Sequence, residues 1–304
     1  MNSIRAIARA AVRIGTALGL VTAAALTPCT PAVAAQARVN VVAAENFYGD
    51  VVKQLGGDYV DVTSILSNPD QDPHLFEASP KTARALHSAT LVVYNGAAYD
   101  PWMEKLLAAS PSAKRTVIVA AALVGVKPGD NPHLWYKPQT MPALARAVSA
   151  ALAAADPAHR AQYDANLARF IESLKPIEAH IARLGKSYAG TPVTATEPVA
   201  GYLSDAIGLA MRNTRFQLSV MNDTEPAASD IVAFEQDLRG KRVRALIYNA
   251  QAVSKLTERM LALAKQAHVP AVRVTETEPA GQTYQQWMSG QIDSLAKALG
   301  DSQP

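Results

Sequence analysis

Two short stretches of this chain place a histidine in the same stiff setting. Residues 68–76 read NPDQDPHLF, and residues 130–135 read DNPHLW. In each stretch a proline comes directly before the histidine, and a leucine and a large aromatic residue come after it. Proline fixes its own backbone conformation and restricts the residue that precedes it. Both loops therefore hold an imidazole stiffly, which suits a preorganised site for a cation.

Two glutamates occur in comparable settings later in the chain. Glu197 stands directly before a proline, and Glu276 stands three residues before one. Each of the two histidines and two glutamates comes after a stretch that we predict to be a strand. In open parallel sheets, ligands bind beyond the carboxyl ends of the strands. The pattern therefore makes His74, His133, Glu197 and Glu276 candidate ligands of one divalent metal ion, with two nitrogens and up to four oxygens.

Each of these residues also has an ordinary structural explanation. A histidine in a proline loop is more often a surface residue, and a glutamate before a proline often only begins a helix. Their matching places, two in each half of the chain, favour a common site. The main alternative is a metal-dependent hydrolase that keeps an open coordination position, with Glu45 as general base. A second alternative is a receptor for an organic solute, which has no special need of paired histidines.

Short apolar runs alternate with amphipathic stretches in both halves of the chain, which is typical of parallel sheets covered by helices. The predicted strands are Val39–Ala44, Val60–Leu66, Leu91–Tyr94, Thr116–Ala120, Pro192–Thr196, Val243–Tyr248 and Ala271–Thr275. The predicted helices are Phe47–Leu55, Lys81–His87, Trp102–Ala109, Val199–Ile207, Ser229–Leu238, Ser254–Gln266 and Tyr284–Leu299. We therefore expect an α/β fold of two lobes, each with a mainly parallel sheet flanked by helices.

A single long helix is predicted between the two lobes. Asp156 and Pro157 form a helix start, with proline at the first helical position. Apolar residues then recur in steps of four and three, at Tyr163, Leu167, Phe170, Leu174, Ile177, Ile181 and Leu184. This stripe lies on one face of a helix roughly 45 Å long. A coiled-coil dimer is the competing interpretation, but three heptads are marginal for one. We favour a spine that joins two lobes of a monomer.

The first 34 residues have the features of a secretory signal peptide. Three arginines precede an apolar run from Ile14 to Leu26, and residues 32–34 read AVA, a cleavage-site pattern. Cys29 is the only cysteine, and the proline before it argues against a lipid-anchor site. We therefore expect a periplasmic protein whose metal ligands are nitrogen and oxygen. The predicted divisions are a signal peptide (1–34), an N-terminal metal-binding lobe (35–155), a spine helix (156–189) and a C-terminal metal-binding lobe (190–304).

The composition limits the partners of the chain. Of its 304 residues, 49% are hydrophobic and 18% are charged, so a sizeable core is possible. Without the three arginines of the leader, 26 basic and 26 acidic residues remain. A neutral protein of this kind is not expected to bind nucleic acid.

At the two histidine stretches the sequence resembles the solute-binding proteins of ABC transporters for manganese and zinc, the metal receptors with a helical spine. The resemblance extends over essentially the whole chain after the leader. Residues 44–50 (AENFYGD) are similar to the family's first strand and helix, and residues 91–96 (LVVYNG) to a later strand. Residues 72–77 (DPHLFE) and 131–135 (NPHLW) are similar to its two histidine motifs, the second of which usually reads Asp-Pro-His.

The resemblance implies a ligand set that coincides with the candidates above. His74 and His133 match the N-lobe ligands, and Glu197 matches a position that is histidine in most zinc receptors and glutamate in many manganese receptors. The fourth family ligand is usually an aspartate, whereas this chain has Glu276 there, with Glu278 as a possible competitor. The histidine-rich loop of some zinc receptors is absent from the sequence.

The resemblance further implies capture of manganese or zinc and delivery to an ABC permease in the inner membrane, without catalysis. Two histidines and two carboxylates are a harder donor set than three histidines, which shifts the balance towards manganese or iron, and of these we favour manganese slightly. Zinc, however, binds most nitrogen and oxygen sites more tightly. We expect capture to weaken below about pH 6.5, where an ordinary histidine becomes protonated.

If the two histidines are ligands, replacing either one must remove a metal–nitrogen bond. We predict that His74→Ala or His133→Ala lowers the affinity for manganese and zinc by at least about tenfold. Isothermal titration of the metal-free protein measures this, with His87→Ala as the control, since His87 ends a predicted helix. If His74→Ala and His133→Ala bind the metals as tightly as the wild type, the predicted metal site is wrong.

Overall fold

Two four-stranded sheets with the same strand order form the centre of the protein. The computed structural model describes residues 38–68, Phe76 and residues 79–301. The first sheet has the order β2-β1-β3-β4, and the second has the order β6-β5-β7-β8. All neighbouring strands are parallel. The strands are β1 (Val39–Glu45), β2 (Val60–Leu66), β3 (Leu91–Tyr94), β4 (Thr116–Val119), β5 (Pro192–Ala195), β6 (Ala210–Arg212), β7 (Leu246–Asn249) and β8 (Ala271–Val274).

The central strands are almost entirely apolar because helices cover both of their faces. Every residue of β3 is buried, and so is every residue of β1 except Asn40. Continuous apolar runs of this kind are typical of parallel sheets. In each sheet the strand order reverses at the middle pair, β1 and β3 or β5 and β7. Binding sites of such folds lie beyond the carboxyl ends of the strands at this reversal.

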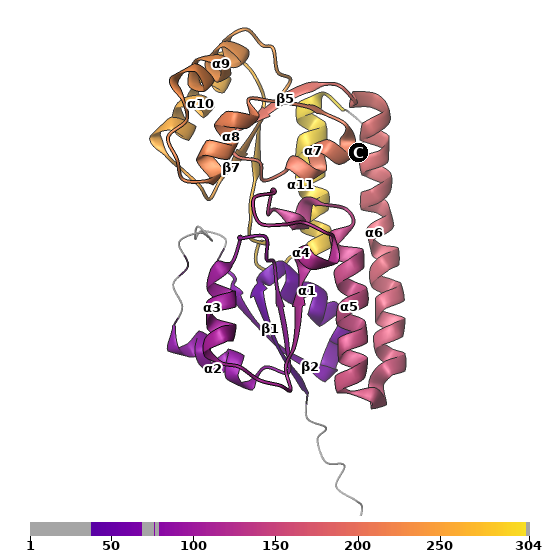
Figure 1. Ribbon diagram of the computed structural model, residues 1–304. Helices are drawn as coiled ribbons and strands as arrows, with labels where there is room; N and C mark the ends of the chain where they lie inside the picture. The colour runs from indigo at the N-terminus through magenta and orange to yellow at the C-terminus, as the bar shows by residue number, and fades with distance from the viewer. Residues whose placement is uncertain (1–37, 69–75, 77–78, 302–304) are drawn as a thin grey trace, which may run out of the picture. The chain divides into compact units, whose positions relative to one another are not determined.

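Helices connect successive strands and supply the covering layers (Figure 1). They are α1 (Asn46–Gly56), α2 (Pro80–Ser88), α3 (Pro101–Ala109), α4 (Ala120–Leu123), α5 (Thr140–Ala155), α6 (Arg160–Tyr188), α7 (Gly201–Ile207), α8 (Thr214–Met221), α9 (Ala228–Arg239), α10 (Lys255–Gln266) and α11 (Tyr284–Leu299). Short 3-10 turns are η1 (Gly57–Tyr59), η3 (Leu134–Tyr136) and η4 (Pro157–His159). The starts of α10 and α11 are fixed by capping boxes at Ser254 and Thr283.

Helix α6 is the predicted spine, and it runs for 29 residues without a break at Pro176. It packs against α5, α7 and α11, as Figure 1 shows for α5. The apolar stripe that predicted it is buried or packed against one core, to which both sheets contribute. Asn166 on the same helix donates a hydrogen bond to the carbonyl oxygen of Leu55 at 2.7 Å. The apolar face of α6 is therefore covered by other elements of its own chain, as we expected for a spine.

The predicted architecture of two parallel sheets joined by a long helix is confirmed, with differences in detail. The strand predicted from Val243 begins only at Leu246. Strand β6 and helices α5 and α8 were not predicted, and β6 is only three residues long, too short for a period to be recognised. In the described part of the chain, no helix is long and apolar enough to cross a membrane. The predicted signal peptide lies outside the described residues.

Candidate metal centre

His133 lies at the end of the loop between α4 and η3, and the contacts of this loop leave one ring nitrogen available. The side-chain oxygen of Asn131 accepts a hydrogen bond from the backbone nitrogen of His133 at 3.1 Å and lies 2.6 Å from its Nδ1. A carbonyl oxygen can only accept, so Nδ1 carries the proton and Nε2 keeps its lone pair. The amide nitrogen of Asn131 in turn donates to the carbonyl oxygen of Pro198 at 2.7 Å. The imidazole is thus oriented as a metal ligand would be.

Glu197 and Glu276 lie just after β5 and β8, and both are almost completely buried. Asn249 at the end of β7 lies between them. Its amide nitrogen donates to Oε2 of Glu197 at 2.7 Å and to Oε1 of Glu276 at 2.5 Å. The loop of Glu276 is fixed by Gln251, whose side-chain oxygen accepts a hydrogen bond from the Glu276 backbone nitrogen at 2.6 Å. One amide therefore joins the two carboxylates.

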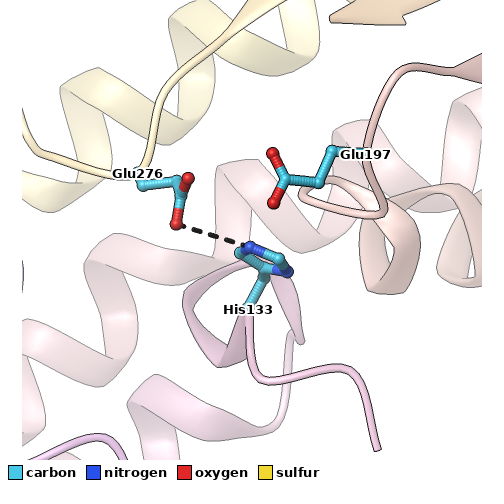
Figure 2. A group of neighbouring side chains, drawn as sticks. All are labelled: His133, Glu197 and Glu276. Atoms are coloured by element: carbon cyan, nitrogen blue, oxygen red, sulfur yellow. Dashed lines mark ion pairs between the residues drawn. The ribbon is translucent and has the colours of Figure 1, made fainter. Parts of the chain in front are cut away.

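These three side chains form one group that could hold a metal ion. Ligand atoms of His133, Glu197 and Glu276 all lie within 4.8 Å of one another. Nε2 of His133 is 3.4 Å from Oε2 of Glu276, and Figure 2 shows both carboxylates next to the imidazole ring. A neutral imidazole and two carboxylates together balance the charge of a divalent cation. The mixture of nitrogen and oxygen donors suits zinc and other first-row metals.

The structure brings together three of the four candidate ligands. His74 lies outside the described residues, so its place in this group stays a prediction, as does the ligand role of the other three. Asn249, Gln251 and Asn131 were not predicted to be parts of the site. Asn249 comes directly after the predicted strand Val243–Tyr248. Its position at a strand end is the signal that could have identified it, because the candidate ligands occupy equivalent positions.

The first sheet carries a matching asparagine at the same topological place. Asn95 comes directly after β3, as Asn249 ends β7, and it is fully buried. Its amide nitrogen donates to the carbonyl oxygen of Pro132 at 2.9 Å, and its oxygen accepts from the hydroxyl of Tyr48 at 2.6 Å. Asn95 therefore supports the loop that carries His133, whereas Asn249 contacts the carboxylates directly.

Glu278, the possible competitor of Glu276, lies in a different environment. Its backbone nitrogen donates to the side-chain oxygen of Asn46 at 3.1 Å, and the Asn46 amide donates back to the Glu278 carbonyl oxygen at 2.7 Å. The residue lines a cavity of about 490 Å³ with Asn46, Asp50 and Lys53. Burial, with a smaller contribution from Asp50, raises the pKa of Glu278 to about 8. Among the described residues, Glu276 and not Glu278 belongs to the His133 group.

Glu45, the general base of the hydrolase alternative, is buried at the end of β1. Burial, followed by the nearby Asp100 carboxylate, raises the pKa of Glu45 well above its ordinary value. Asp100 is held by the backbone nitrogens of Asn95 and Gly96, at 2.7 and 2.8 Å. Among the described residues, Glu45 is therefore paired with another buried carboxyl group and does not belong to the His133, Glu197 and Glu276 group.

The separate environments of Glu276 and Glu278 give a test of the ligand assignment. We predict that Glu276→Gln lowers the affinity for zinc and manganese by at least about tenfold, because it removes a charged ligand. Glu278→Gln should lower it less. Calorimetric titration of the two metal-free variants measures the difference, and a larger loss in Glu278→Gln would reverse the assignment.

The raised pKa of Glu278 also predicts a pH dependence of stability. Between about pH 4.5 and pH 8 the folded protein keeps a proton that the unfolded chain releases, so stability falls as the pH rises through this window. Glu278→Gln removes this effect. From pH 5 to pH 8, the unfolding free energy of the metal-free wild type should fall by on the order of 4 kcal/mol more than that of the metal-free variant.

Urea denaturation at the two pH values measures this difference, and Glu225→Gln is the control because Glu225 is exposed. The same stability difference between wild type and Glu278→Gln at both pH values would contradict the assignment of a raised pKa to Glu278.

Comparisons with known proteins agree with this architecture. The manganese ABC transporter substrate-binding lipoprotein PsaA of Streptococcus pneumoniae is 22% identical over 284 residues, covering 86% of this chain and 89% of that protein. The lipoprotein FimA of Streptococcus parasanguinis, a metal ABC transporter substrate-binding protein, is 23% identical over 287 residues, covering 87% of this chain and 90% of that protein.

Two solved structures show the same fold. The periplasmic zinc binding protein TroA from Treponema pallidum matches with a TM-score of 0.72 at 20% identity, over 86% of this chain and 99% of that one. The solute-binding protein FpvC from P. aeruginosa, solved in complex with Ni²⁺, matches with a TM-score of 0.70 at 21% identity, over 88% of this chain and 98% of that one.

The family model described as zinc-uptake complex component A, periplasmic, matches residues 41–298, from β1 to α11. This confirms the resemblance carried by the two histidine motifs, and it gives no support to the hydrolase alternative. Substrate-binding proteins of ABC transporters are not a class of enzymes. This chain therefore belongs to the family of the periplasmic zinc-uptake component A, the metal-binding components of ABC transporters.

Proposed function

We propose that this protein captures a divalent transition metal, manganese or zinc, between its two lobes and delivers it to an ABC permease for uptake. The observation that carries the proposal is the grouping of His133, Glu197 and Glu276, whose ligand atoms lie within 4.8 Å of one another. They come from three loops at the carboxyl ends of strands in two different sheets. An ion bound there links the two halves of the chain, as a capture site requires.

The charges and the burial of the group support the binding of a divalent ion. A divalent cation is neutralised by the two carboxylates, and the neutral imidazole adds a nitrogen donor without further charge. All three side chains are almost fully buried, so the ion loses most of its water on binding. With His74 as the fourth ligand, four protein donors would fill a tetrahedral site and leave no open position for a reacting water. Such a site holds an ion and performs no chemistry on a substrate.

The identity of the metal is inferred from the proteins to which this chain is similar and from its own donors. The description of the family names zinc, that of PsaA names manganese, and FpvC was solved in complex with nickel. Two nitrogens and two carboxylates accept either manganese or zinc. We propose that the physiological ion is one of these two.

The setting of the protein is inferred from the same family. Its members named above are periplasmic or lipoprotein components, so we place this protein outside the inner membrane. We propose that residues 1–34 are a cleaved signal peptide, that 35–155 and 190–304 form the two lobes, and that 156–189 connect them. We further propose that it acts as a monomer, without catalysis and without nucleic acid, and that Cys29 is removed with the leader.

The experiment that tests this function combines metal analysis with an assay for hydrolysis. Protein purified from its native compartment should contain close to one equivalent of manganese or zinc by elemental analysis. The metal-free protein should bind both ions in calorimetric titrations, while His133→Ala binds at least about tenfold more weakly. The loaded protein should not cleave phosphate or carboxylate ester substrates. Absence of binding, or metal-dependent ester cleavage, would contradict the proposal.

A further inference from the structure

Asn249 contacts both carboxylates of the candidate metal centre through a single amide group. It ends β7 and is 3% exposed. Its side-chain nitrogen has two hydrogens, and it donates to Oε2 of Glu197 and to Oε1 of Glu276. The side-chain oxygen accepts a hydrogen bond from the backbone nitrogen of Gln251 at 3.0 Å. The orientation of the amide is therefore fixed, and both of its hydrogens are directed at candidate ligands.

These hydrogen bonds determine which oxygen of each carboxylate can approach an ion best. Oε1 of Glu276 is directed at Asn249, while Oε2 of the same residue lies 3.4 Å from Nε2 of His133. Glu197 likewise directs Oε2 at the amide. In Figure 2 the two carboxylates lie beside the imidazole. An oxygen that accepts a short hydrogen bond has part of its electron density engaged, so each glutamate is arranged to offer one oxygen rather than two.

The number of oxygens offered matters for the choice of metal. Zinc in proteins is typically bound by four ligands in a tetrahedron, with one oxygen from each carboxylate. Manganese, with the harder cations, favours oxygen-rich sites of higher coordination number. His133 and two one-oxygen carboxylates provide three donors, so that one further ligand completes a tetrahedron, whereas two-oxygen carboxylates would already provide five donors.

We propose that Asn249 is a positioning residue that sets the metal selectivity of the site, by holding Glu197 and Glu276 in one-oxygen binding and so favouring zinc over manganese. This inference rests on the proposed function, because it requires that the centre binds both ions. It weighs against the preference for manganese that donor hardness alone suggested.

Asn95 provides a matched control for this role. It has the same residue type, it is also buried, and it comes directly after β3 much as Asn249 ends β7. Its amide donates to Pro132 and Gly96 carbonyl oxygens and to no candidate ligand. Loss of Asn95 disturbs the His133 loop, which affects any bound ion, whereas loss of Asn249 changes how the carboxylates bind.

The test compares the ratio of the manganese and zinc dissociation constants in four proteins: wild type, Asn249→Leu, Asn249→Ala and Asn95→Leu. Leucine preserves the volume of asparagine without its hydrogen bonds, and alanine is the second variant in case leucine does not fit. The folding of each metal-free protein is checked by circular dichroism.

We expect both Asn249 variants to bind zinc about 10- to 100-fold more weakly than the wild type, with a smaller loss of affinity for manganese. The ratio should therefore fall at least about fivefold, whereas Asn95→Leu should weaken both ions similarly and keep the ratio.

The outcomes separate the inference from the proposed function. If the wild type binds neither ion, the proposed function fails. If the wild type binds both but the ratio is unchanged in the Asn249 variants, or falls equally in Asn95→Leu, the role of Asn249 is wrong. X-ray absorption of the zinc-loaded wild type needs no variant: four ligands, with one oxygen from each glutamate, support the inference, and five or six overturn it.

Discussion

The burial of two carboxylates beside each other is the constraint on which this structure depends. Glu197 and Glu276 are almost fully removed from water, and burial of charge without compensation is costly. The amide of Asn249 offsets part of this cost by donating to both. In the function proposed above, a divalent cation would offset more of this cost, because its two positive charges balance the two carboxylates. The site is thus arranged so that an ion stabilises it, which links metal binding to the packing of the loops around it.

In both sheets, an asparagine at the end of a central strand holds the residues of the candidate site. Both have the same strand order, and in both an asparagine lies at or just after the end of the third strand. In the first sheet this asparagine supports the loop that carries an imidazole, and in the second it supports the carboxylates themselves. The spine helix α6 packs on helices associated with both sheets and shares their core. The loops that carry the candidate ligands therefore project from a scaffold with a common apolar core.

Three residues of the candidate site could be grouped from the sequence because they come after strands that have clear apolar patterns. His133, Glu197 and Glu276 each lie within a proline-containing loop beyond a predicted strand. The supporting residues were missed, because an asparagine at a strand end has no distinctive pattern by itself. Strand β6 was missed because three residues cannot show a period. Hydrogen bonds between residues far apart in the sequence, such as Asn249 to Glu197, cannot be inferred from local pattern.

The sequence by itself determined the candidate ligands, the prolines in their loops, the spine and the family, because these depend on local residue order. Only the tertiary structure shows that Glu276, and not Glu278 two residues further on, lies in one group with His133. Their separation comes from contacts with distant segments: Gln251 binds the backbone nitrogen of Glu276, and Asn46 binds that of Glu278. These contacts turn one carboxylate towards His133 and place the other beside Asn46 and Asp50. Neighbours in sequence thus acquire different environments because different parts of the fold bind their backbones.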